Sequence, residues 1–246
     1  AGDLLGGVAA LPDRAVASTN SAYLHATRLK HPHSIAMSMF FLAMVYFCRK
    51  EPDKVYKYAQ ELISLSEKHM IGSWPSLGRS LLGWAMVKTG DSTHGMKNIY
   101  EGLDHAQRIG VCMWVPVITA GLVEILIDAG SLDKAAEHLV RVREYMESSE
   151  ELNYLAEFER LDGELLRARG KVRSAENAFN NALDVARSQQ SLMLQLRAVV
   201  SLARLYQDTD WKQEVAILVK PVLDKISEGE TTQDVRAAQD LLLLKR

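Results

Sequence analysis

The feature that most constrains this chain is a repeat with a period of 40 residues. Glycine occurs at Gly90, Gly130 and Gly170, each at a point where a helical pattern stops. Glycine readily adopts the left-handed backbone conformation that often follows the last turn of a helix. Self-similarity at a fixed period is the signature of a repeat architecture, in which each repeat is one supersecondary unit. The sequence therefore predicts an array of similar units joined by turns.

Two further series of positions keep this period and carry small or β-branched side chains. They are Ala43, Gly83, Val123, Gly163 and Ala203, and then Ala15, Val55, Gly95, Ala135, Ala175 and Val215. Small side chains that face each other let two backbones approach closely, as the crossing point of an antiparallel helix pair requires. Two interleaved series therefore predict a helical hairpin in each unit. Trp74, Trp114 and Tyr154 also recur at this period, and we expect them to lie between neighbouring hairpins.

The predicted fold is all-α, an α-α superhelix formed by one repeat domain over residues 1–246. Few prolines and many strong helix formers agree with it. Five full repeats are expected at 31–70, 71–110, 111–150, 151–190 and 191–230. Their first helices are expected at 32–49, 73–89, 112–129, 152–169 and 191–208, and their second helices at 52–69, 92–109, 132–149, 172–189 and 212–227. Residues 1–30 are predicted to be a partial repeat, with a helix at 12–29, inside a larger polypeptide. Residues 231–246 are predicted to hold a capping helix, at about 232–244.

Charge and residue content argue against several kinds of function. Lys and Arg total 29 against 31 Asp and Glu, so no overall positive field attracts nucleic acid. No apolar run reaches the length of a membrane span, which favours a cytoplasmic protein without a membrane partner. The histidines and two cysteines form no pattern typical of a metal, catalytic or cofactor site. We therefore expect no catalytic residue, no metal ligand and no cofactor.

The segment at 156–187 resembles a tetratricopeptide (TPR) repeat, because Gly163, Gly170, Ala175, Phe179 and Ala182 fall at that motif's spacing. More widely, the chain is similar to the C-terminal TPR-like region of bacterial STAND/AAA-type signalling ATPases. Segments that carry this resemblance include LPDRAVA, HPHSIAMSM, LLGWAMVKTG and LRAVVSLARLY. In that family an adenylyl cyclase or a DNA-binding winged helix precedes the ATPase. The resemblance implies a TPR-like solenoid that serves signal transduction or transcription regulation. No GxxxxGK[ST] phosphate loop occurs in this chain.

First helices line the concave groove of such arrays, which identifies candidate ligand-binding residues. They are Trp84, Glu124, Glu157, Arg160, Glu164, Arg167, Arg197 and Arg204. In one interpretation the arginines clamp a carboxylate or phosphate and Trp84 offers a stacking face. In the other, the charges, three or four residues apart, only pair with each other. At the N-terminal end the same face is apolar, and upstream helices or closure of the superhelix would cover it.

These observations predict a non-catalytic sensor or scaffold module. Its groove is expected to bind a protein or peptide, or a small effector. Binding would then act on the ATPase and output domains of the parent protein. The alternative is a structural oligomerisation element of the same parent, with no separate ligand.

Overall fold

The computed structural model describes residues 11–111, 113–149, 152–206 and 212–243, without the side chains of 212–214. All regular secondary structure in these ranges is helical, which confirms the predicted all-α class. The described residues fall into two compact units, Pro12–Ile118 and Thr119–Arg246, and the division lies within helix α7 (Val115–Asp128). The units are called N-terminal and C-terminal below, and each is described by itself. The single domain over 1–246 stays a prediction.

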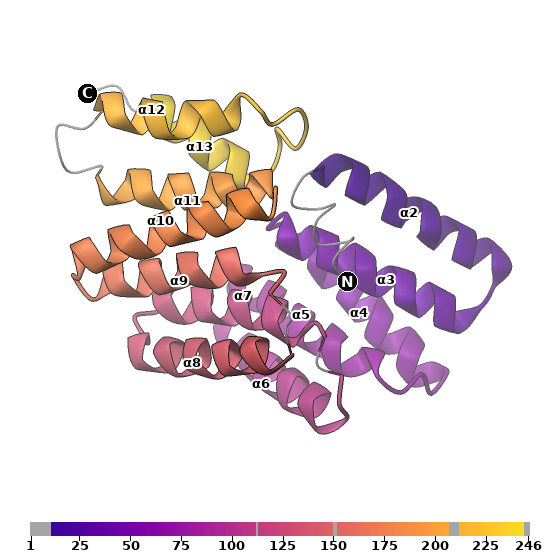
Figure 1. Ribbon diagram of the computed structural model, residues 1–246. Helices are drawn as coiled ribbons and strands as arrows, with labels where there is room; N and C mark the ends of the chain where they lie inside the picture. Colours follow the sequence, from indigo (N-terminus) through magenta and orange to yellow (C-terminus); the bar gives the residue numbers. More distant parts are fainter. Residues whose placement is uncertain (1–10, 112, 150–151, 207–211, 244–246) are drawn as a thin grey trace. The chain divides into compact units, whose positions relative to one another are not determined.

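The N-terminal unit consists of successive helices that pack each against the next (Figure 1). They are α2 (Pro12–Leu29), α3 (Pro32–Cys48), α4 (Pro52–Lys68), α5 (Trp74–Lys88) and α6 (Ser92–Arg108). Proline at the first position starts α2, α3 and α4, where the missing N–H would have no helical partner. Asp91 caps α6 by accepting a hydrogen bond from the backbone N–H of His94 at 3.2 Å. Helix α2 covers the helix predicted at 12–29, whereas the partial repeat over 1–30 stays a prediction.

The two interleaved series of small residues meet as predicted between α5 and α6. A Cβ atom added to Gly83 would lie 2.5 Å from the carbonyl oxygen of Gly95 and 2.7 Å from the amide nitrogen of Ile99. A Cβ atom added to Gly95 would lie 2.7 Å from the carbonyl oxygen of Gly83. These distances are shorter than any real Cβ contact, so the two backbones cross here without room for a side chain. The crossing of a helical hairpin is therefore confirmed at this pair.

The turns between helices share one backbone conformation but not one residue type. Gly90, Gly110, Gly130 and Gly170 have positive φ angles, between 71° and 111°. Equivalent turns at other places use Lys30, Lys50, Met70 and Gln190, with φ between 52° and 58°. A residue with a Cβ atom is sterically strained in this left-handed region, whereas glycine is not. The recurring glycines therefore mark only some of these turns. The positive φ angle itself recurs at every described turn between neighbouring helices of the array.

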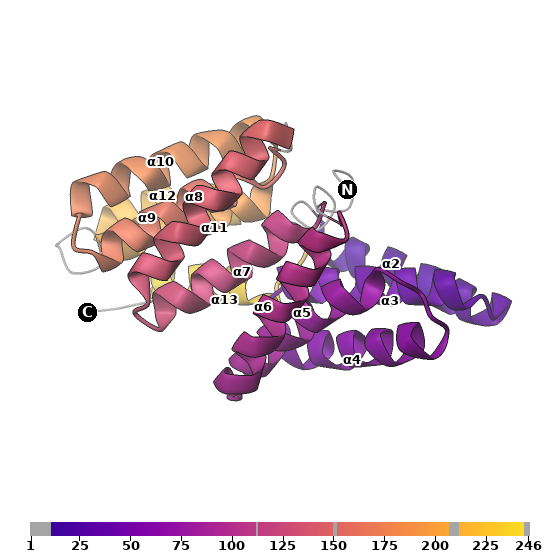
Figure 2. The same ribbon diagram turned by 90° about the horizontal axis from the view of Figure 1, so that it is seen from below.

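The C-terminal unit holds the remainder of α7 and six further helices. They are α8 (Leu132–Ser149), α9 (Leu155–Ala168), α10 (Val172–Ser188), α11 (Leu192–Leu205), α12 (Lys212–Leu223) and α13 (Gln233–Leu243). Helices α9 and α10 run side by side (Figure 2), and Gly163 of α9 lies under the ring of Phe179 on α10. The small residue here faces an aromatic ring rather than another small residue. Helix α13 corresponds to the predicted capping helix.

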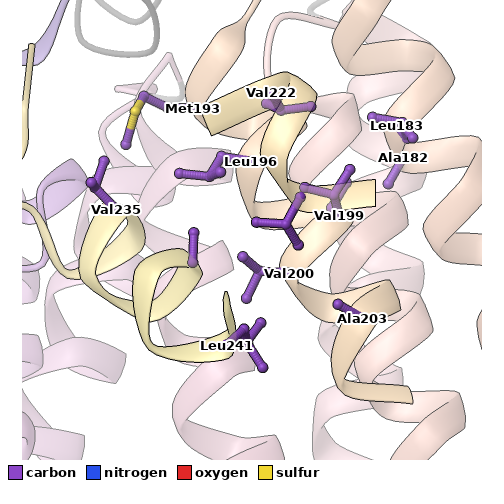
Figure 3. Packing of buried hydrophobic residues seen from close by; sticks show 13 residues of the cluster. Ala182, Leu183, Met193, Leu196, Val199, Val200, Ala203, Val222, Val235 and Leu241 are labelled. Atoms are coloured by element: carbon purple, nitrogen blue, oxygen red, sulfur yellow. The ribbon is translucent and has the colours of Figure 1, made fainter. Parts of the chain in front are cut away.

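Helix α11 is the centre of this unit, because every side chain from Met193 to Ala203 is buried. Its Leu196 and Val200 pack in one apolar cluster with Val235 and Leu241 of α13 (Figure 3). Val222 of α12 and residues of α10 complete the cluster. Each fully buried aliphatic side chain of this size contributes roughly 1.5–3 kcal/mol. The amphipathic pattern of α13 therefore holds it against α11.

Most predicted helix boundaries agree with the structure within about one residue, but four do not, and one of these is the end of α11, at Leu205 rather than at 208. Helices α7 and α9 begin at Val115 and Leu155, about three residues later than predicted. Before α9 a turn is formed first, since the N–H of Leu155 donates to the carbonyl of Leu152 at 3.0 Å. Helix α12 ends at Leu223 rather than at 227, and hydrogen-bonded turns follow it. The predicted turn at 208–210 lies outside the described residues.

Candidate functional site

A ladder of charged side chains on α9 forms the base of the candidate site. Glu157, Arg160, Glu164 and Arg167 follow at spacings of three and four, which places them on one face of the helix. Arg160 donates through Nε and Nη2 to both carboxylate oxygens of Glu157, at 3.0 and 2.7 Å. Arg167 donates through Nε to Glu164 at 2.9 Å. The α9 face is therefore a set of ion pairs within one helix.

Side chains from α7, α11 and α13 join this face. Ser201 of α11 donates to Glu164 at 2.7 Å, and Arg160 Nη1 lies 3.4 Å from the same hydroxyl oxygen. Glu124 of α7 lies 3.9 Å from Arg160. Arg197 of α11 donates through Nε to Asp234 of α13 at 2.8 Å. The result is one continuous charge network over four helices of the C-terminal unit.

Arg197 also links back to the α9 face. Its Nη1 lies 3.5 Å from Glu157 and 3.5 Å from the hydroxyl oxygen of Tyr154. Glu157 therefore lies between two guanidinium groups, those of Arg160 and Arg197. Because the arginine guanidinium presents five donors in a planar fork, it can bind several acceptors at once. This arrangement satisfies buried charges that would be costly if they were unpaired.

The network is shielded from water. Glu157 is 4% exposed, Arg160 6% and Arg197 8%. Burial alone would lower the pKa of Arg160, but the carboxylates of Glu157, Glu124 and Glu164 outweigh it and raise that pKa. Burial likewise opposes the charge of Arg197, and Asp234 and Glu157 raise its pKa in spite of it. Both arginines therefore stay charged inside the unit.

The eight predicted groove residues differ in how far a partner can reach them. Glu157, Arg160, Glu164 and Arg197 are buried in the network, and Glu124 is partly exposed. Arg167 is 44% exposed, and Arg204 of α11 is exposed without an ion pair among the described residues. The four buried residues thus make the ion pairs that the second interpretation expects. A ligand-binding role for these residues stays a prediction, and Arg167 and Arg204 are the most accessible of them.

Trp84, the eighth residue, belongs to the N-terminal unit and is only 3% exposed. Its ring lies edge-on to Phe47, with 4.8 Å between the ring centroids. The expectation of an open stacking face is therefore wrong, because the indole is buried. Among the described residues, its Nε1 has no hydrogen-bond partner. This is an unsatisfied buried donor, which costs roughly 1–3 kcal/mol.

The apolar first-helix face of the N-terminal unit is mostly interior. Phe40, Met44 and Phe47 of α3 are buried, whereas Met37 is 39% exposed. Phe40 contacts both recurring tryptophans, with ring centroids 5.2 Å from Trp74 and 5.5 Å from Trp114. These aromatic contacts connect α3 with the starts of the next two first helices. The recurring aromatic residues therefore do pack between hairpins in this unit.

One polar pair was not predicted from the sequence. Ser76 of α5 and His105 of α6 share a hydrogen bond between Oγ and Nδ1. The serine is buried and the imidazole exposed, and the two residues lie 29 positions apart in the sequence. Among the described residues, no carboxylate hydrogen-bonds to this imidazole. The pair links two helices of one hairpin, and neither residue belongs to the series that recur every 40 residues.

Two general observations limit the chemistry of the described part of the chain. Its His, Cys, Asp and Glu side chains form no group of three or more that could hold a metal ion. None of its helices combines the length and the apolar character needed to span a lipid bilayer.

The comparisons with known proteins agree with the helical hairpins and their packing. The model of the tetratricopeptide repeat-like domain family matches residues 36–202, more than half of the chain. The chain therefore belongs to the tetratricopeptide repeat-like family. Domains of this class are generally scaffolds for protein–protein interaction. The comparison with curated proteins gave no match.

Proposed function

We propose that this chain is a non-catalytic, protein-binding sensor or scaffold module of a larger bacterial ATPase that serves signal transduction or transcription regulation. Its position is intracellular, in the cytoplasm. Support comes from the TPR-like hairpins and from the resemblance to the repeat region of STAND/AAA-type ATPases. A protein segment, a peptide or a small effector binds the array and changes the activity of the ATPase and output domains.

The observation that carries this proposal is the buried charge network. Ion pairs and hydrogen bonds join α7, α9, α11 and α13, so the first helices of the C-terminal unit form a rigid platform. A rigid binding surface loses less conformational entropy on association than a flexible one. Arg167 and Arg204 stand at the ends of neighbouring first helices, where a partner's carboxylates reach them. Binding there leaves the pairs of Arg160 with Glu157 and of Arg197 with Asp234 intact.

The experiment uses the parent polypeptide and compares two double variants. In Arg167→Ala/Arg204→Ala the exposed groove cations are removed. In the matched control, Arg141→Ala/Arg187→Ala, the same charge is removed from exposed second-helix positions. We expect the groove variant alone to alter effector-dependent ATP hydrolysis, because only it removes partner contacts. Equal activity of both variants would refute the groove role.

The parent itself is tested by its coding sequence upstream of this chain. A GxxxxGK[ST] phosphate loop in the same reading frame is expected. Its absence would refute the ATPase assignment, whatever the array binds.

Exposed apolar residues favour the second candidate function, an oligomerisation element. Ile217 on α12 and Leu243 on α13 are each 69% exposed. Apolar side chains at the edge of an array fit contact with a second copy. Light scattering across a concentration range discriminates the two functions. A mass that stays monomeric at all concentrations would exclude this candidate.

A further inference from the structure

The turn between α9 and α10 carries the most basic stretch of the chain, RARGKVR at residues 167–173. Arg169, Lys171 and Arg173 are all exposed. Arg169 donates to Asp133 at 2.8 Å and to the carbonyl of Leu132 at 3.3 Å. These contacts bring the start of α8, with the exposed Lys134, next to the turn. Residues 134, 169, 171, 172 and 173 are called the basic turn surface below.

Most of the positive charge on this surface is not neutralised. Asp133 pairs with Arg169, and Arg167 at the edge of the surface is held by Glu164. Lys134, Lys171 and Arg173 make no ion pair with any residue that the structure describes. Three cations are therefore available to an external anionic group.

An apolar side chain lies in the middle of these charges. Val172 is 54% exposed, and its sequence neighbours on both sides are cationic. More than half of this residue therefore lies outside the core of the hairpin. Val172 offers an apolar contact to a partner whose negative charges pair with the cations on either side of the valine.

Comparison between repeats shows that folding does not require this charge. The second residue of α2, α4 and α8 is Asp13, Asp53 and Asp133, whereas in α10 it is Arg173. Acidic residues are favourable in the first turn of a helix, and cations are unfavourable there. Arg173 therefore opposes local helix stability at a position where three sister helices carry the favourable charge. A binding role gives a reason for the exception.

We infer that the basic turn surface docks an acidic segment of a partner protein, with an apolar side chain of that segment resting on Val172. The inference depends on the proposed protein-binding function and names the class of partner. The surface has no aromatic ring on which the bases of a nucleic acid stack. A single valine is too little apolar area for insertion into a membrane interface.

The test measures fluorescence anisotropy of a labelled synthetic peptide that alternates glutamate clusters with leucine. The variant is Lys171→Glu/Arg173→Asp, in which the second change installs the residue found in the sister helices. The control, Lys220→Glu/Lys225→Glu, makes the same change of four charges at exposed positions of the same unit. We expect wild type and control to bind the peptide alike, and the variant to bind it at least about tenfold more weakly. Its melting temperature should not fall, because Arg173→Asp improves the first turn of α10.

Three results would overturn the inference. They are equal binding by variant and control, no binding of the peptide by the wild-type chain, and tighter binding of single-stranded DNA or phosphatidylserine vesicles than of the peptide. The proposed function has a separate readout in the effector-dependent ATPase assay. A parent protein that loses regulation in Arg167→Ala/Arg204→Ala but not in Lys171→Glu/Arg173→Asp would retain the binding function and reject this surface.

Discussion

Replacing Gly83 by alanine sets two opposing effects against each other at the α5–α6 crossing. Alanine is more favourable than glycine inside a helix by roughly 1 kcal/mol. The new Cβ, however, would lie 2.5 Å from the carbonyl oxygen of Gly95 and 2.7 Å from the amide nitrogen of Ile99. Both contacts are with backbone atoms, so no side-chain rotation relieves them. The two helices must separate.

The magnitude follows from these two effects. Overpacking costs typically about 1–3 kcal/mol, and a rigid backbone contact belongs at the upper end of that range. Subtracting the gain in helix propensity leaves a net loss of about 2 kcal/mol. For a chain of this size, such a loss lowers the melting temperature by roughly 4–8 °C.

Gly78→Ala is the matched control, because Gly78 lies in the same helix. A Cβ there would meet Ile63 Cγ1 at 3.1 Å and Leu62 Cδ2 at 3.2 Å. These are side-chain atoms that can move by a few tenths of an ångström, so the propensity gain offsets most of the cost. Thermal and urea unfolding, followed by circular dichroism at 222 nm, measures both variants. A Gly83→Ala protein as stable as Gly78→Ala would refute the close-approach argument.

Three further substitutions test other parts of the structure. Arg160→Met leaves Glu157 buried without its main cation, so the free energy of unfolding should fall by about 3–5 kcal/mol, and adding Glu157→Gln should recover part of it. A loss below about 1 kcal/mol in urea titration would contradict the buried network. Ser66→Ala removes a buried hydroxyl that has no hydrogen-bond partner in the described part of the chain, so the free energy of unfolding should rise by roughly 1 kcal/mol in the same assay. A loss of stability would show that the hydroxyl is satisfied. Burial, and to a smaller extent the positive charge of Arg141, lower the pKa of His138 in the folded chain. The unfolded chain therefore binds this proton at a higher pH than the folded chain does, so the free energy of unfolding should fall as the pH drops below about 6.5. His138→Gln should reduce this pH dependence between pH 7.5 and 5.5, and identical slopes in the two proteins would contradict it.

The hairpins could be predicted because the residues that define them recur in register. Gly83 and Gly95 belong to two different series, and the requirement for close backbones is the same wherever two helices cross. Such a pattern can be read without knowing any distant contact. The late starts of α7 and α9 could not be read in this way, because they depend on a local turn such as the one at Leu152.

The charged site was predicted only in part, for a physical reason. The spacing of Glu157 and Arg160 on α9 fixes their pairing within one helix. Burial of Arg197 depends on Asp234, which comes from α13 and lies outside the period of the array. The hydrogen bond between Ser76 and His105 also has no counterpart in the described residues of the other repeats. Contacts that occur once leave no periodic trace in a single sequence.

The buried charge network has a consequence for how the C-terminal unit opens. In a simple solenoid each hairpin touches only its neighbours, and terminal hairpins fray independently. Here Glu157 of α9 binds Arg197 of α11, which in turn binds Asp234 of α13. Detachment of α13 therefore leaves the buried guanidinium of Arg197 without the carboxylate of Asp234. Amide hydrogens from α9 to α13 should therefore exchange with solvent as one cooperative block instead of in a gradient from the end of the array.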